Sequence, residues 1–110
     1  MTDTSTSLRV AIAGATGRMG QMLIDAVRAA GDCTLSGALE RADSPAQGQD
    51  AGAHAGWASG VTITADLDAG LRGAAVLIDF TRPEATLAHL AVCQRLGVAM
   101  VIGTTGFTDA

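Results

Sequence analysis

Apolar residues occur along this chain in two arrangements that predict different secondary structures. Short uninterrupted apolar runs are typical of strands buried on both faces of a parallel sheet. Such runs predict strands at residues 8–13, 34–40, 61–64, 74–80 and 98–102. Between several of them, apolar positions recur at helical spacing. This alternation predicts an α/β fold: a Rossmann-type doubly wound parallel sheet with right-handed crossovers and strand order 3-2-1-4-5.

The first predicted helix follows the first strand and is expected to end at Gly31, in the usual position for a glycine after a helix. The apolar face expected to be buried consists of Met19, Met22, Leu23, Ala26, Val27 and Ala30. Both methionines are interpreted as core-filling side chains. A second, short helix is predicted with Asp66 as its N-cap and an end near Leu71.

The third predicted helix follows the fourth strand. Thr81 and Glu84 have the spacing of a capping box, and Pro83 lies in the expected first turn. Gly97 is expected to end this helix. The positions predicted to be buried are Leu87, Leu90 and Ala91, whereas His89 is interpreted as structural or exposed.

Residues 41–60 show neither period and are rich in small and polar side chains. They predict a long loop, with one helical turn near residues 51–55. His54 is interpreted as an exposed loop histidine and not as a metal ligand, because no second ligand lies near it in the sequence. Trp57 could pin the loop to the domain or approach a ligand, and pinning is the expectation.

A glycine-rich turn joins the first strand to the first helix. In dinucleotide-binding domains, the glycines of such a turn make the chain reversal, let the backbone approach a pyrophosphate, and allow close packing of helix on strand. Gly17 and Gly20 match the last two glycines of the usual pattern, but Gly14 comes one residue early. Backbone N–H groups at the start of the helix would face the diphosphate, and the helix dipole favours its negative charge.

Other distinctive segments fall where predicted strands end. In a sheet of this order the first and fourth strands are neighbours, and ligands bind outside the carboxyl ends of the strands at that switch point. Glu40 is the last residue of the second predicted strand, about 20 residues beyond the glycines, where an acid binds the adenosine ribose. Phe80–Arg82 follows the fourth strand and Gly103–Gly106 the fifth. Together with the glycine turn, they predict one crevice for a dinucleotide.

Composition narrows the functional classes. The net charge of −4 argues against non-specific nucleic-acid binding. Cys33 and Cys93 form no ligand cluster and are interpreted as buried free thiols in a reducing compartment. Residues 1–7 are polar, do not resemble a signal peptide, and are expected to be a disordered tail before a dinucleotide-binding domain at 8–110. No apolar run has membrane-spanning length, so a cytoplasmic protein is expected.

Four segments together carry a family resemblance: the glycine turn within Val10–Gly20, Glu40-Arg41, Ile78–Glu84 and Val101–Phe107. They resemble the 4-hydroxy-tetrahydrodipicolinate reductase (dihydrodipicolinate reductase) family of the diaminopimelate route to lysine. The early first glycine is normal in that family. The resemblance extends over essentially the whole chain beyond the tail, and it implies reduction of a cyclic imine dicarboxylate by hydride transfer from NADH or NADPH.

The resemblance also implies which positions contact the cofactor. It places the pyrophosphate at Gly14, Ala15, Thr16, Gly17, Arg18 and Met19, and the nicotinamide at Gly103, Thr104 and Thr105. It places the adenosine ribose at Glu40 and the 2′-phosphate of NADPH at Arg41, whose guanidinium suits a phosphate. Thr81 and Arg82 are expected to line the groove.

By the same resemblance, the catalytic motif, the substrate segment and the tetramerisation sheet lie beyond residue 110. The chain contains no lysine, so the family's catalytic lysine is absent from it. We therefore expect a cofactor domain that binds NADH or NADPH without turnover, contains no catalytic residue, and forms a homotetramer only as part of the full-length protein.

Two other functional classes are alternatives to a reductase domain. A complete short-chain dehydrogenase needs a tyrosine and lysine pair, and the chain has neither residue type. A non-catalytic NAD(P)-binding sensor or regulatory module stays open as an alternative.

Overall fold

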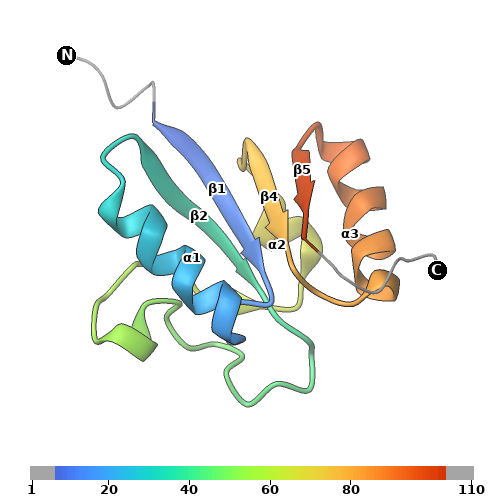
Figure 1. The fold of residues 1–110 in the computed structure, drawn as a ribbon. Coiled ribbons are helices and arrows are strands. Elements are labelled where there is room, and N and C mark those ends of the chain that lie inside the picture. Colours follow the sequence, from blue (N-terminus) through green and yellow to red (C-terminus); the bar gives the residue numbers. More distant parts are fainter. Residues whose placement is uncertain (1–6, 104–110) are drawn as a thin grey trace.

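The strands form one parallel sheet in the order β3-β2-β1-β4-β5, as the sequence predicts (Figure 1). The computed structural model describes residues 7–103. The strands are β1 (Leu8–Ala13), β2 (Cys33–Leu39), β3 (Ile63–Thr64), β4 (Val76–Asp79) and β5 (Ala99–Ile102). All but β1 are shorter than the apolar runs that predicted them or shifted by a residue. The predicted pairing of β1 with β4 is confirmed, so the switch point lies between them.

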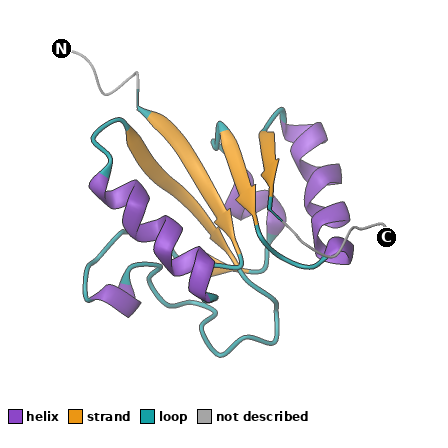
Figure 2. Ribbon diagram, in the orientation of Figure 1, coloured by secondary structure: helices purple, strands orange, loops and turns teal. Residues whose placement is uncertain are grey.

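Helices lie on both faces of the sheet (Figure 2). They are α1 (Arg18–Ala29), α2 (Leu67–Leu71) and α3 (Pro83–Leu96), with a single 3₁₀ turn at Ala53–Ala55 in the predicted position. In Figure 1, α1 crosses one face over β1 and β2, while α2 lies behind the sheet. The described helices are all too short or too polar to cross a membrane.

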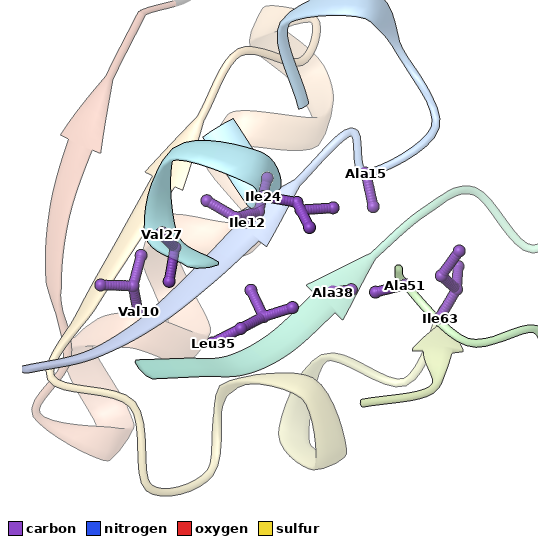
Figure 3. Close-up of a cluster of buried hydrophobic side chains, with 9 residues drawn as sticks. All are labelled: Val10, Ile12, Ala15, Ile24, Val27, Leu35, Ala38, Ala51 and Ile63. Carbon is purple, nitrogen blue, oxygen red and sulfur yellow. The ribbon is translucent and has the colours of Figure 1, made fainter. Parts of the chain in front are cut away.

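Alternate side chains of β1 supply two hydrophobic cores. Val10 and Ile12 face α1, in a cluster with side chains from β2 and β3 (Figure 3). Ala11 and Ala13 face the opposite side, where they join residues of α2 and α3. This alternation follows from the period of two in a strand, and it explains why the run is apolar throughout. Full burial of a side chain such as Ile12 contributes about 1.5–3 kcal/mol.

Helix α1 buries a face that is rotated from the predicted one, and Val27 is the one fully buried residue common to both. Its buried residues are Gly20, Ile24 and Val27. Met19 and Met22, predicted to fill the core, are 45% and 59% exposed. The reason is a close contact: a Cβ on Gly20 would lie 2.0 Å from the carbonyl oxygen of Gly14. The helix is therefore rotated so that this glycine, and the residues in line with it, face the sheet.

Helix α3 also differs from its prediction. Its N-cap is Arg82, which makes no side-chain capping bond, so the predicted capping box is absent. The Thr81 hydroxyl donates instead to the carboxylate of Asp79, at 2.5 Å. The buried positions are Thr86, His89 and Cys93. Of the predicted core positions, Leu87 and Ala91 are exposed and Leu90 is half-buried. His89 faces the sheet because the buried Asp79 carboxylate accepts its hydrogen bond.

Asp66 and Gly97 are correctly predicted as helix ends, whereas Gly31 is not. Asp66 caps α2 by accepting a hydrogen bond from the backbone N–H of Ala69, at 3.2 Å. Gly97 ends α3 in the left-handed conformation. Gly31 does not end α1 in this way. Ala30 turns the chain in an extended conformation, and its N–H bonds to carbonyls of the last turn.

The loop at residues 41–60 is organised around the carboxylate of Asp50. It accepts hydrogen bonds from the backbone N–H groups of Gly52 (2.7 Å), Ser59 (2.9 Å) and Gly60 (2.8 Å), and from the Ser59 hydroxyl (2.9 Å). These bonds lower the pKa of Asp50 to about 2. One ionised side chain thus closes the loop on itself.

Two further side chains attach this loop to α1. The His54 ring is within hydrogen-bond distance of the Asp25 carboxylate, at 3.0 Å, and of the Ala51 carbonyl oxygen, at 3.1 Å. Taken as a whole residue, His54 is exposed, as predicted. Its side chain alone is only 17% exposed. Trp57 lies under the guanidinium of Arg28, 4.6 Å from ring centroid to carbon, which confirms that it pins the loop.

We predict that Asp50→Asn destabilises the protein at neutral pH and much less in acid. The folded-state pKa of Asp50, about 2, lies below the ordinary value of 3.8. Its contribution is therefore fully present above pH 3.8 and is lost as the pH falls from 3.8 toward 2. Urea unfolding of both proteins at a series of pH values measures the difference in free energy of unfolding.

The matched control is Asp43→Asn, in the same loop. Its carboxylate is exposed and has only a surface ion pair with Arg41, so little change is expected at any pH. A difference between wild type and Asp50→Asn that stays constant across this pH range would contradict the role given to the ionised carboxylate.

Candidate functional site

Every segment that the sequence places at the switch point and that the structure describes lies at one edge of the sheet. The strand arrowheads in Figure 1 point to this edge, where the chain leaves β1, β2, β4 and β5. Direct contacts link the segments in series, from Glu40 to Thr16, from Gly14 to Thr81, and from Phe80 to Gly103. Thr104 and Thr105 lie outside the described residues. We call this linked edge the nucleotide groove, after the ligand that the sequence analysis predicts there.

The glycine turn owes its shape to two of its glycines. Gly14 has a φ of +79°, which side chains other than glycine rarely adopt. Its carbonyl oxygen accepts the N–H of Gly17 at 3.0 Å and closes the turn. The same oxygen faces Gly20, where the closest approach leaves no room for a Cβ. Two of the three predicted glycine roles, the tight turn and the close helix packing, are therefore present in the structure.

Gly17 differs from the other two, because the fold does not require it. Its backbone is extended, and a Cβ there would meet one protein atom within 4 Å, the carbonyl oxygen of Gly14 at an ordinary 3.4 Å. Gly17 is the N-cap of α1 and has no side chain with which to cap the helix. The first turn of α1 contains no acidic residue. The first N–H groups of a helix have no acceptor within it. This end of α1 is therefore open and suited to an anion.

Glu40 has a function in the structure that the sequence did not reveal. Its Oε2 accepts both the backbone N–H of Thr16, at 3.0 Å, and the Thr16 hydroxyl, at 2.6 Å. Its Oε1 accepts the N–H of Arg41 at 3.0 Å. Burial would raise the pKa of Glu40, but the hydrogen bonds from Thr16 and Arg41 outweigh it and lower the pKa. The carboxylate thus ties the end of β2 to the glycine turn.

Arg41 lies beside this tie with its guanidinium in solvent. Within the described residues its side chain forms an ion pair with Asp43, 3.5 Å away, and the two side chains are 79% and 78% exposed. An ion pair this exposed contributes little stability. The guanidinium is therefore free to exchange partners.

A second carboxylate, this one buried, organises the other side of the groove. Asp79, the last residue of β4, is fully buried. It accepts hydrogen bonds from Thr81 and has His89 Nδ1 at 2.7 Å. Burial would raise the pKa of Asp79, but the hydrogen bonds from His89 and Thr81 lower it. Neither Asp79 nor His89 was predicted as a site residue, and an apolar run ending in an acid was the one available signal.

The remaining predicted positions are spread along the same edge. Arg18 and Met19 are exposed at the start of α1, and Arg82 is exposed at the start of α3. Ala15 is buried beneath the turn. Among residues 7–103, no three histidine, cysteine or acidic side chains lie close enough to hold a metal ion.

Comparison with known proteins identifies one family. A family model described as dihydrodipicolinate reductase, N-terminus, matches residues 8–110. Relatives named 4-hydroxy-tetrahydrodipicolinate reductase are 66% identical over 103 residues in Cupriavidus pinatubonensis and 64% identical over 101 residues in Ralstonia nicotianae. These matches cover 94% and 92% of this chain but 39% and 38% of the relatives, so the chain spans about two fifths of their length.

A solved structure agrees with this result. The dipicolinate-bound dihydrodipicolinate reductase from Paenisporosarcina sp. TG-14 matches with a TM-score of 0.72 at 29% sequence identity. The match covers 94% of this chain and 39% of that one. Sequence and fold therefore point to the same family.

We predict different effects on stability for alanine at two glycines of the turn. Gly20→Ala should destabilise the protein by about 1–3 kcal/mol, because its Cβ would overlap the carbonyl oxygen of Gly14. Gly17→Ala should change stability by no more than about 0.5 kcal/mol, because its Cβ would meet only the Gly14 carbonyl oxygen, at the ordinary contact distance of 3.4 Å. Thermal and urea unfolding of the two variants provide the comparison. Equal destabilisation would mean that Gly17, too, is required by the fold.

Proposed function

The chain belongs to the dihydrodipicolinate reductase family, as its N-terminal domain, and from that premise we propose that it is the NAD(P)H-binding domain of a 4-hydroxy-tetrahydrodipicolinate reductase. The observation that carries the proposal is the nucleotide groove itself. An uncapped helix N-terminus, an acid after β2, the loop after β4 and Gly103 after β5 lie along the carboxyl edge of the sheet that contains its switch point.

The residues present fit a dinucleotide. Gly17 leaves space for a diphosphate at the amides of α1, and no acid in the first turn of that helix would repel it. Oε1 of Glu40 accepts one described hydrogen bond and has capacity for another, as a ribose hydroxyl requires. Arg41 offers an exposed guanidinium for a 2′-phosphate. Gly103 and the residues after it would flank the nicotinamide, which supplies the hydride when bound.

Reduction of the cyclic imine dicarboxylate needs more than this chain provides. The family's catalytic motif contains a lysine, and this chain has none. The two acids of the groove, Glu40 and Asp79, are ionised and hydrogen-bonded to its loops. We assign catalysis, substrate binding and assembly into a homotetramer to the other three fifths of the full-length protein, which acts in the cytoplasm in lysine biosynthesis.

We predict that this chain binds NADH and NADPH but reduces nothing. Calorimetric titration measures the binding, and a steady-state assay with the cyclic imine, generated from pyruvate and aspartate semialdehyde, measures turnover. Turnover near the usual enzyme range of about 1–1000 s⁻¹ would contradict the assignment of catalysis to the rest of the protein. Failure to bind either nucleotide would overturn the proposed function.

Gly17→Val provides the matched variant for the same titration. Its side chain would occupy the space left for the diphosphate, so affinity for both cofactors should fall by about a hundredfold or more. The fold should persist, as circular dichroism of the same sample would show. Unchanged affinity in a folded variant would mean that the diphosphate does not approach this turn.

We predict that Arg41→Ala weakens NADPH binding and spares NADH. A hydrogen bond to a charged group contributes about 1.5–3 kcal/mol, so the loss for NADPH should be about ten- to a hundredfold. Titration with both cofactors measures the ratio of affinities.

The neighbouring acid provides the control. Asp43→Ala removes the present partner of Arg41 and should leave NADPH affinity unchanged or improved. Equal losses for the two cofactors in Arg41→Ala would show that Arg41 does not read the 2′-phosphate.

A further inference from the structure

The loop after β4 forms one wall of the nucleotide groove, and its shape depends on two contacts. The Cβ position of Gly14 lies 3.3 Å from Cγ2 of Thr81, so the Thr81 methyl group lies against the glycine turn. A Cβ on Gly103 would lie 2.0 Å from Cε1 of Phe80, so the ring covers that glycine. Thr81 and Phe80 therefore fix how the loop meets β1 on one side and β5 on the other.

A single carboxylate holds this loop. Oδ1 of Asp79 accepts the backbone N–H of Thr81 at 2.8 Å and its hydroxyl at 2.5 Å. Oδ2 is held by His89 Nδ1 at 2.7 Å. Asp79 is fully buried and the His89 side chain is 10% exposed, so solvent competes little with these bonds. The loop is thus connected through Asp79 to the second turn of α3.

Packing alone does not explain a buried Asp–His pair. Such pairs rarely stabilise a fold more than well-packed apolar side chains of similar size do. What a carboxylate adds is direction, because its lone pairs orient the groups that donate to it. Here both bonds at Oδ1 come from the groove loop, and the bond at Oδ2 orients the carboxylate itself.

We infer that Asp79 and His89 are positioning residues of the nucleotide groove. Together they hold Thr81 against Gly14 and Phe80 over Gly103 before the cofactor arrives. Neither side chain contacts the cofactor. The inference rests on the proposed function, because it takes the groove to be the NAD(P)H site.

The test compares the affinity of folded protein for NADH in wild type, His89→Leu and His89→Asn. Leucine removes the hydrogen bond to Oδ2, whereas the asparagine amide offers an N–H near the place of Nδ1. We expect His89→Leu to weaken NADH binding about tenfold and His89→Asn to recover most of that loss. The backbone amide signal of Thr81 in a ¹H–¹⁵N spectrum should shift in the leucine variant and return toward its wild-type position in the asparagine variant.

Val98→Ala is the matched control for general destabilisation. Val98 is a buried residue of the core that Ala11 and Ala13 form with α2 and α3. It precedes β5, at the opposite end of that strand from the groove. It should lower stability without changing NADH affinity. If His89→Leu does not fold, Thr81→Val replaces it, because that change removes one bond to Asp79 and keeps the backbone one.

The outcomes separate the two proposals. Wild-type affinity in folded His89→Leu, or in Thr81→Val where it takes its place, would overturn the positioning role and leave the proposed function intact. Equal loss of affinity in His89→Leu and Val98→Ala would overturn it as well, because the effect would then follow stability alone. Absence of NADH binding in the wild type would overturn the proposed function and this inference together.

Discussion

The contact between Gly20 and the carbonyl oxygen of Gly14 determines much of the structure around it. A helix can approach a strand this closely only where no Cβ intervenes. Once Gly20 faces the turn, the helical period places Ile24 and Val27 on the sheet as well. The same contact holds the N-terminus of α1 at the carboxyl edge of the strands (Figure 1). Core packing and the direction of the helix dipole therefore have one cause.

Two carboxylates maintain the groove on either side of that helix end. Glu40 ties the end of β2 to the glycine turn, and Asp79 ties the loop after β4 to α3. Each is at least partly withdrawn from water, which by itself favours the neutral acid. In each case hydrogen bonds to the ionised form outweigh burial, and the pKa is lowered. The loops are therefore held by charged acceptors, whose hydrogen bonds are stronger than those between neutral groups.

The sequence was sufficient for the architecture and insufficient for the faces of the helices. Strand positions follow from uninterrupted apolar runs. Their order follows from the doubly wound class that the alternation of strands and helices predicts. The face of α1 was wrong because Met19 and Met22 are as apolar as core residues, and only the approach of Gly20 to the turn decides the rotation. The start of α3 was wrong because the Thr81 hydroxyl has a better acceptor in Asp79 than in the helix backbone. Tertiary contacts decided both.

The position of Glu40 was predictable, but its hydrogen bonds were not. The spacing from the glycines identifies the residue, whereas the Thr16 amide and hydroxyl reach its carboxylate only after β1 and β2 pair. Each carboxylate oxygen accepts about two hydrogen bonds, so Oε2 is fully used by Thr16 and Oε1 has capacity left beside the Arg41 amide. A ribose hydroxyl bound at Oε1 would leave the turn intact, while one at Oε2 would have to displace Thr16. Replacing Glu40 therefore removes a ribose acceptor and releases the glycine turn at once, so loss of affinity in such a variant cannot be assigned to ribose recognition alone. Among residues 7–103 the Arg41 side chain forms only an exposed ion pair with Asp43, so its replacement allows the adenosine end to be examined separately from the turn.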